Sequence, residues 1–174
     1  MTDLKTLEST VLVKGEPFIG CIQTELGIIS ASIDGVVLFF GYDDTVEQLS
    51  LKCQARPSAL YSSGQMLFVG DWEGNLYQYN LTSKQLRTFT FEKFQYENRT
   101  VPNGVYSICV ANGQILVGLS SGELAVGAKG NFSLLKVHEK AIRQIIPAGE
   151  QIVTVGNDGR ACQINLKKME SIEI

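Results

Sequence analysis

One local pattern occurs four times in this chain: an apolar strand, a tight polar turn that ends in glycine, and a second strand. The turn glycines Gly35, Gly74, Gly122 and Gly159 lie 39, 48 and 37 residues apart. A period of about 40 residues with strand patterns is typical of a β-propeller, in which four-stranded sheets called blades surround an axis. Because a single blade cannot bury both faces of its sheet, each blade needs neighbours. The repeat therefore predicts an architecture before any single residue is considered.

The strand patterns predict one all-β domain over residues 1–174, a β-propeller of four blades with four antiparallel strands each. The second strand of each repeat is almost entirely apolar, as expected for a strand buried on both faces. The fourth strand alternates between polar and apolar residues, which suits a half-exposed outer strand. The blades are expected at residues 15–53, 54–91, 104–138 and 139–174, with an additional strand at 7–14 and a loop insertion at 91–103.

The number of blades leaves the closure of the propeller open. Seven blades of about 40 residues would need about 280 residues, whereas 174 residues suffice for four. Three alternatives are open. The strand at 7–14 could close a small ring, or the blades could form an open arc completed by a second copy or by another protein. The third is that the chain is a fragment of a longer propeller. The last residues, SIEI, favour the arc because they already supply a final outer strand. An open arc exposes the apolar flanks of its first and last blades.

Charge and cysteine usage limit the classes of function. A net charge of −3 and an isoelectric point near 5.2 argue against a general binder of nucleic-acid backbones. The first ten residues are polar and lack the apolar core of a signal peptide, so we expect an intracellular protein, cytoplasmic or nuclear. The four cysteines lie far apart in predicted strands, which favours buried reduced thiols over a zinc site.

No catalytic, cofactor-binding or metal site is predicted. The string Gly118-Leu-Ser-Ser-Gly122 matches a hydrolase elbow, but that elbow needs a strand-to-helix turn and this one joins two predicted strands. His138-Glu139 begins like a zinc-protease motif, but Ile142 stands where the second histidine would be. Asp43-Asp44 is interpreted as a solvated turn, and Lys167-Lys168 is too short for a nucleic-acid patch.

The fourth repeat, KVHEKAIRQIIPAGEQIVTVGNDGRACQINL, resembles a WD repeat. It has a histidine before its first strand, apolar positions through two strands, and Asp-Gly at the turn. The resemblance implies a structural hydrogen-bond network of His138, Thr154 and Asp158. The chain departs from the WD pattern because no repeat contains Trp-Asp or Gly-His, and Ile164 stands where the network would have its tryptophan. A second segment, FVGDWEGNLYQYNLTSKQLRTF, resembles a quinoprotein-type propeller repeat, but the other three repeats do not share its pattern.

One candidate partner site follows from the turns and the insertion. Trp72 is the single tryptophan and lies in a tight turn, and tryptophan is enriched at binding hot spots. In a WD-type propeller this turn and the insertion at 91–103 share one face. The alternative is that Trp72 covers the neighbouring blade and that the aromatic residues of the insertion pack locally. The predicted contact residues are Trp72, Glu73, Phe94, Tyr96 and Arg99, with the turn acids Asp34 and Asp158.

The repeats together with the lack of catalytic residues predict a non-catalytic WD-repeat-like scaffold for protein–protein interactions, a subunit or adaptor of a larger complex. Its partners are expected to be proteins, with self-association or completion of the propeller by another chain as one form. We expect no cofactor and no membrane partner. Two alternatives stay open: a quinoprotein-like propeller with a cofactor or enzymatic role, and a reader of basic or modified peptides, such as histone tails, through Asp34, Glu73 and Asp158.

Overall fold

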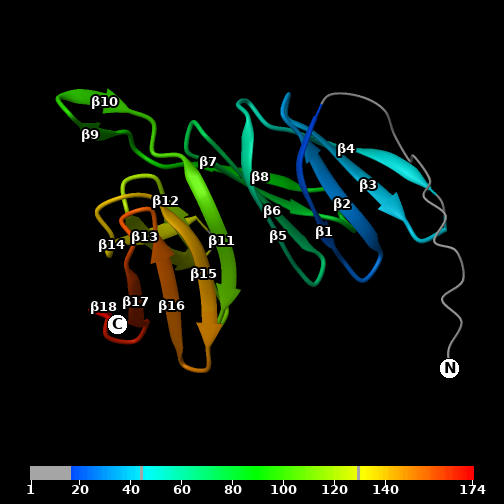
Figure 1. Ribbon diagram of the computed structural model, residues 1–174. Coiled ribbons are helices and arrows are strands. Elements are labelled where there is room, and N and C mark those ends of the chain that lie inside the picture. The colour runs from blue at the N-terminus through cyan, green and yellow to red at the C-terminus, as the bar shows by residue number, and fades with distance from the viewer. Residues whose placement is uncertain (1–16, 44, 129) are drawn as a thin grey trace, which may run out of the picture.

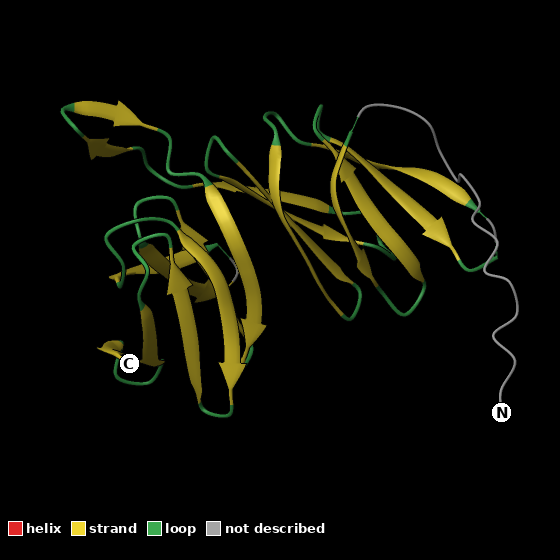
Figure 2. Cartoon of the chain, viewed as in Figure 1, coloured by secondary structure: helices red, strands yellow, loops and turns green. Residues whose placement is uncertain are grey.

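A computed structural model of the chain describes residues 17–43, 45–128 and 130–174. These residues form four four-stranded antiparallel sheets and one two-stranded hairpin, and Figure 2 shows strands and loops but no helix among them. Within this part of the chain no helix is long and apolar enough to cross a membrane. The additional strand expected at 7–14 falls outside the described residues. The predicted all-β class and the four antiparallel blades are confirmed.

Each sheet is a meander, with its strands side by side in chain order. The first sheet contains β1 (Phe18–Gln23), β2 (Gly27–Ser32), β3 (Val36–Gly41) and β4 (Val46–Lys52). The second contains β5 (Pro57–Ser63), β6 (Met66–Asp71), β7 (Asn75–Asn80) and β8 (Leu86–Thr90). The third contains β11 (Val105–Ala111), β12 (Gln114–Leu119), β13 (Glu123–Ala128) and β14 (Asn131–Lys136). The fourth contains β15 (Ile142–Ala148), β16 (Gln151–Gly156), β17 (Ala161–Asn165) and β18 (Glu170–Glu173).

The four sheets stand side by side in an open arc. The first strands of consecutive sheets contact one another, β1 with β5, β5 with β11, and β11 with β15. Figure 1 shows the first and fourth sheets at opposite ends of the row. Three apolar clusters lie between successive sheets, one for each neighbouring pair. Because burying one large apolar side chain is worth about 1.5–3 kcal/mol, these clusters are the main source of stability.

Burial differs with strand position, and the second strands are more buried than the first strands, such as β1 and β15. The second strands of the two middle sheets, β6 and β12, are buried at all but their first residue. The fourth strands are mostly exposed, and β18 is exposed along its whole length. Strand order therefore runs from the interior of the arc to its rim, as the sequence predicts.

The turns between second and third strands dock on the connections between sheets. In three turns the glycine carbonyl accepts a backbone hydrogen bond from the connection that follows: Gly35 from Cys53 at 3.0 Å, Gly74 from Phe91 at 2.9 Å, and Gly122 from Val137 at 3.1 Å. The same turns bond to the preceding connection, with Trp72 N donating to Arg56 O and Ser120 N donating to Gly104 O. The turns and the connections therefore lie on one face of the arc, which we call the loop face.

A β-bulge at the same place in every first strand adds a second link between sheets. The strand register shifts between Phe18 and Gly20, between Pro57 and Ala59, and at the matching positions of β11 and β15. Two serines near these bulges bond to the next sheet: Ser58 Oγ donates to Val105 O at 2.5 Å, and Ser107 Oγ donates to Ile142 O at 2.9 Å.

One cysteine differs from the expectation of buried thiols. Cys53, Cys109 and Cys162 are buried and free, but Cys21 is exposed. It lies in β1, on the side of the first sheet that faces away from the second, where none of the described sheets covers it. The sequence pattern identifies a strand residue but does not show that the neighbouring sheet is absent on that side.

The insertion at 91–103 is more ordered than a loop. It contains a hairpin of β9 (Phe94–Tyr96) and β10 (Arg99–Val101), which Figure 1 shows projecting from the sheets. Its two-residue turn has positive φ at Glu97 (46°) and Asn98 (61°), the geometry that matches the twist of paired strands. The sequence analysis predicted a loop here because the turn lacks the glycine that marks the other four.

The matched turn glycines Gly122 and Gly159 provide a test of turn docking. Their φ angles are 83° and 80°, but a Cβ on Gly122 would lie 2.0 Å from His138 O, whereas a Cβ on Gly159 would meet nothing within 4 Å. We predict that Gly159→Ala lowers the free energy of unfolding by about 1–2 kcal/mol through backbone strain alone. Gly122→Ala should cost a further 1–3 kcal/mol, roughly, because the backbone must also shift. Urea unfolding measures both, and equal losses would contradict docking of the turns.

Candidate interaction face

His138 ties the connection before the fourth sheet to the turn of that sheet. It is 1% exposed. Its Nδ1 lies 3.0 Å from Oδ1 of Asp158, and its Nε2 lies 2.9 Å from Oγ1 of Thr154. A Cβ on Gly156 would lie 2.6 Å from Nδ1 of His138, so glycine makes room for the imidazole. The structure thus brings together the three residues to which the WD-repeat resemblance assigns a network.

The Asp158 carboxylate is enclosed by donors. Besides His138, the backbone amides of Glu139 and Arg160 donate to it at 2.9 Å and 3.2 Å, and its side chain is 7% exposed. Burial raises the pKa of Asp158, but the hydrogen bonds from Glu139, Arg160 and His138 outweigh burial and lower the pKa to about 2. The carboxylate therefore stabilises the loop face and is not free to meet a partner.

The second sheet has a network of its own, which the sequence analysis missed. Asp71 is fully buried at the end of β6. Its carboxylate accepts hydrogen bonds from the backbone amide and the side-chain amide of Asn75, both at 2.9 Å, and from the Tyr77 hydroxyl at 3.0 Å. The Tyr77 hydroxyl in turn accepts from the backbone amide of Gln54 at 2.7 Å. Asp71 thus links the turn to the preceding connection, as Asp158 does in the fourth sheet.

The signal for this network is present in the sequence as an acidic residue that ends an otherwise apolar strand, MLFVGD. The environment around it is strongly desolvated. Burial, with the charge of Asp71 adding to it, raises the pKa of the Cys53 thiol to about 12. Burial likewise raises the pKa of the Tyr77 hydroxyl. A thiol with so high a pKa is a structural group rather than a nucleophile.

The third and first sheets complete the series with shorter links. In the third, Oδ1 of the buried Asn103 accepts from the Ser121 backbone amide at 3.0 Å, which joins connection to turn. In the first, Ser32 Oγ donates to the exposed Asp34, and this bond lowers the pKa of the carboxyl. Ser120, the serine of the elbow-like string, lies in the turn between β12 and β13, a strand-to-strand hairpin.

Trp72 lies exposed on the loop face, in the turn between β6 and β7. Its side chain is 48% exposed, and the guanidinium of Arg56 stacks over its ring at 4.7 Å from the centroid. Such a stack is a cation–π contact that holds both side chains in place. Glu73 is exposed beside Trp72 in the same turn. An ordered aromatic side chain on the surface is a candidate anchor for a partner.

The hairpin is attached to the Trp72 turn at both of its ends. On one side Phe91 N donates to Gly74 O, and on the other a Cβ on Gly74 would lie 2.9 Å from Asn103 O. A Cβ on Gly104 would lie 2.9 Å from Trp72 O. The predicted neighbourhood of Trp72 and the insertion is therefore present in the backbone contacts.

Within the hairpin the predicted residues are largely exposed. Tyr96 is 49% exposed, Arg99 is exposed and Phe94 is half-buried. The Phe94 and Tyr96 rings pack edge to face with centroids 6.5 Å apart. The alternative that these aromatic residues pack locally holds for this pair, but the packing leaves half of Tyr96 in solvent. The hairpin is therefore an ordered projection with an aromatic surface.

An apolar hollow of about 350 Å³ lies between the outer strands β8 and β14, near the root of the hairpin. Phe132 packs edge to face against Phe89 and Phe91, with centroids 5.9 Å and 5.3 Å apart. Leu134 on its rim is 51% exposed. The hollow is at the lower end of the range of about 300–1,000 Å³ for small-molecule sites, and it suits a single apolar side chain of a partner.

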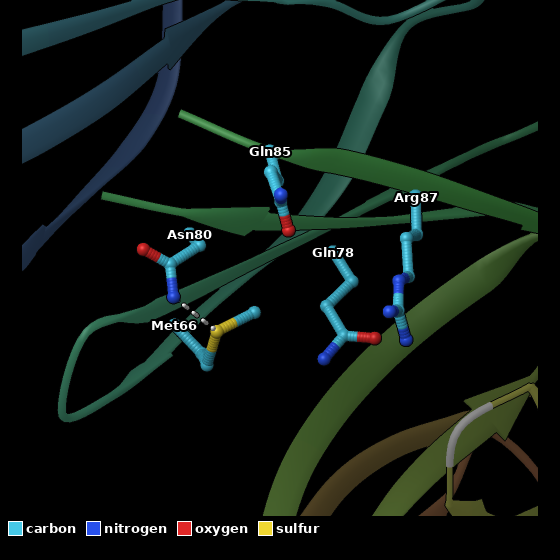
Figure 3. A pocket seen from close by; sticks show the side chains of 5 residues that line it. All are labelled: Met66, Gln78, Asn80, Gln85 and Arg87. Atoms are coloured by element: carbon cyan, nitrogen blue, oxygen red, sulfur yellow. Dashed lines mark hydrogen bonds between the residues drawn. The ribbon is translucent and has the colours of Figure 1, made fainter. Parts of the chain in front are cut away.

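A smaller polar pocket of about 200 Å³ lies on the second sheet. Figure 3 shows the side chains that line it, with Asn80 Nδ2 donating to Met66 Sδ. Oε1 of Gln78 is buried there without a hydrogen-bond partner. The volume is below the usual range for ligand sites, and no group of three potential metal ligands occurs among the residues that the structure describes. The lining residues are Met66, Gln78, Asn80, Gln85 and Arg87.

The three turn acids do not form one site. Asp34, Glu73 and Asp158 lie in the turns of the first, second and fourth sheets, on the shared loop face. Asp34 and Glu73 are exposed, whereas Asp158 is committed to His138 and two backbone amides. Asp158 is therefore not available to join Asp34 and Glu73 in an acidic patch.

Comparison with known proteins identifies the fold. No family model and no curated protein matches the sequence. A crystal structure of the RRP9 WD40 repeats superposes with a TM-score of 0.76 at 17% identity, covering 93% of this chain and 52% of that one. A structure of U3-55K gives 0.76 at 16% identity, covering 93% and 53%. The chain has a WD40-type propeller fold. The predicted likeness to WD repeats is thereby confirmed at the level of the fold.

The extent of these matches is informative as well. The chain spans about half the length of the two WD40 structures. The crystal structure of the computationally designed Ika4 protein superposes with a TM-score of 0.70 at 12% identity, covering 100% of this chain and 99% of that one. Four sheets in a single chain of this size therefore occur in a protein of unrelated sequence.

The lowered pKa of Asp158 predicts a specific acid sensitivity. Because the folded pKa of about 2 is below the unfolded value of about 3.9, the carboxylate stabilises the fold fully above pH 4, and this contribution is lost as the pH falls toward 2. Asp158→Asn should therefore flatten the decline of the free energy of unfolding between pH 4 and pH 2. Urea titrations across this range measure the slope, and parallel slopes for both proteins would refute the assignment.

Asp71 and Asp34 are acids at similar places in two sheets. Asp71 is the last residue of β6, and Asp34 lies in the turn after β2. Asp71→Asn replaces a buried acceptor by a group that also donates, so it should lower the free energy of unfolding by about 2–3 kcal/mol. Asp34→Asn alters one exposed hydrogen bond and should change stability much less. Thermal or urea unfolding of the two variants tests the ranking, and an equal effect would show that the Asp71 network is not structural.

Proposed function

We propose that this chain is a non-catalytic scaffold for protein–protein interactions, a subunit or adaptor of a larger complex. The WD40-type fold supports the general kind of function. The buried polar groups of the described residues also support it, because His138, Asp158 and Asp71 all make structural hydrogen bonds and the Cys53 thiol has a raised pKa. A cytoplasmic or nuclear location is part of the proposal and agrees with three buried, unpaired thiols.

The partner surface is the part of the loop face that carries the Trp72 turn and the β9–β10 hairpin. The observation that carries this assignment is the exposed Trp72 ring held under Arg56, next to the roots of a projecting hairpin. A fixed aromatic side chain loses little conformational entropy on binding, which favours affinity. Tyr96 and Arg99 of the hairpin extend the surface, and the apolar hollow between β8 and β14 adjoins its root.

Binding to this surface combines two chemistries. Trp72 and Tyr96 offer apolar area with polar edges, which suits aromatic or aliphatic side chains of a partner. Arg56 and Arg99 are exposed cations, with Glu73 as an exposed acid beside Trp72. We infer that the partner presents an apolar anchor flanked by at least one acidic group. The two alternatives from the sequence, a quinoprotein-like cofactor role and a reader of basic or modified peptides, stay predictions.

The test compares two exposed aromatic residues on opposite edges of the sheets. Trp72→Ala removes the proposed anchor and should weaken partner capture by about 30-fold or more, the effect of a hot-spot residue. Tyr42→Ala is the matched control, because Tyr42 is 59% exposed in the turn between β3 and β4, away from the loop face. Quantitative pull-down from cell extract measures both.

The single tryptophan supplies a second readout. Emission of Trp72 reports directly on this surface, so adding the captured partner to the purified chain should shift its emission. Loss of capture in both variants, or capture by Trp72→Ala equal to the unmodified chain, would contradict this placement of the partner surface.

A further inference from the structure

Among residues 17–43, 45–128 and 130–174, no sheet packs on the face of the first sheet that points away from the second, and apolar residues lie on this face. Strand pairing places Cys21, Ser30 and Leu38 on this face, with Ile28 and Phe40 beside them. The opposite face carries Ile29 and Ala31, which belong to the cluster shared with the second sheet. On the uncovered face Ile28 is 36% exposed, Cys21 is exposed, and Leu38 and Phe40 are half-buried.

In the second sheet the corresponding face is buried, because the first sheet packs against it. Strand register aligns Ile28, Leu38 and Phe40 with Leu67, Tyr77 and Tyr79. Those three residues pack against the first sheet and are 0%, 2% and 0% exposed. The first sheet therefore carries the bulky side of such a contact, and none of the four described sheets packs against it.

The fourth sheet has the complementary surface at the other end of the arc. Pairing places Ile146 and Val153 on the face away from the third sheet, with Val155 and Ala161 beside them. Ile146 is 44% exposed, and the other three are half-buried. Ile172 pairs with Gln163 on the same face and is 69% exposed.

The two uncovered faces match the two sides of the contact inside the chain. Between the first and second sheets, Tyr77 and Tyr79 of one meet Ile29, Ala31 and Val37 of the other. Strand register aligns Ile29, Ala31 and Val37 with Val153, Val155 and Ala161 of the fourth sheet. Bulky residues thus lie at the start of the arc and smaller residues at its end, as in the contact between the first and second sheets.

The remaining length of the propeller identifies the occupant. The superpositions cover 93% of this chain but only 52% and 53% of the two WD40 structures. Its four sheets therefore follow the curvature of about half such a domain, and a second copy supplies a half of equal size. The aligned positions of the two faces carry no charge. The fourth-sheet face also carries Gln144 and Gln163, and Glu170 lies beside Ile172 on the outer strand β18. Two copies therefore bring no like charges together at the centre of the contact.

We propose that two copies of this chain complete one propeller of eight sheets. The fourth sheet of each copy packs on the first sheet of the other, and a two-fold axis relates the two identical contacts. Each contact repeats the burial that holds neighbouring sheets together within the chain. The proposal goes beyond the scaffold function and does not depend on the Trp72 surface, because the loop face remains exposed in the ring.

The first experiment measures the mass of the 174-residue chain by light scattering, where one copy is 19.1 kDa. The expected particle has twice that mass. Ile146→Arg places a charge in the contact and should raise the dissociation constant at least 100-fold, giving the single-copy mass at micromolar concentration. Leu86→Arg is the matched control, because Leu86 is 41% exposed on β8, away from both uncovered faces. It should keep the double mass.

A second experiment places the two faces together directly. The first strands of neighbouring sheets contact each other within the chain, so Cys21 of one copy should lie near Ile146 of the other. Ile146→Cys should give a covalent two-copy band with a short bis-maleimide, and Cys21→Ser in the same chain should abolish it. The reagent should not link the unmodified chain in this way.

Three results would overturn the proposal. A single-copy mass with Cys21 protected from alkylation would mean that another segment of the chain, such as residues 7–14, covers the first sheet. A single-copy mass with Cys21 reactive would mean that a different protein, or nothing, occupies the faces. A two-copy particle that resists Ile146→Arg and gives no Cys21-dependent band would place the contact elsewhere. Neither mass nor crosslinking reads Trp72, so these failures are distinct from failure of the partner surface.

Discussion

The contact between neighbouring sheets is the interaction on which the rest of this structure depends. Each neighbouring pair of sheets shares an apolar cluster, and in the first pair Tyr77 and Tyr79 of the second sheet pack with Ile29 of the first. The backbone bonds of turns to connections, such as Phe91 N to Gly74 O, fix the same neighbours at the loop face. A four-stranded sheet of this size cannot stay folded with both faces in water, so the fold, the loop face and the two open ends are consequences of one repeated contact.

The polar networks are different solutions to one structural problem. Each joins a turn to the preceding connection, through His138 and Asp158 in the fourth sheet, through Asp71 and Tyr77 in the second, and through Asn103 in the third. Buried polar groups must be paired to be tolerated, and each set is paired within the chain. The diverged repeats therefore keep the geometry of the turn while they change the residues that hold it.

The sequence was sufficient to predict the four repeated sheets, but not all of the side-chain networks and turns within them. Turn glycines and apolar second strands predicted the sheets because these patterns follow from backbone geometry and burial. The WD resemblance led to His138, Thr154 and Asp158. Asp71 was missed although it ends an otherwise apolar strand, because its partners Asn75 and Tyr77 are ordinary strand residues. The hairpin at Phe94–Val101 was missed since Glu97 and Asn98 adopt positive φ without glycine. The exposure of Cys21 depends on which sheet lies beside β1, which strand periodicity does not specify.

Amide hydrogen exchange resolved by strand tests the central claim most directly. If contacts between sheets hold the chain together, the slowest amides lie in β2, β6, β12 and β16, and in the residues that bond to the turn glycines, Cys53, Phe91 and Val137. The outer strands β4, β8, β14 and β18 should exchange much faster, because their solvent-exposed edges open locally. Equal protection of outer and second strands, or fast exchange at Cys53, Phe91 and Val137, would contradict the account.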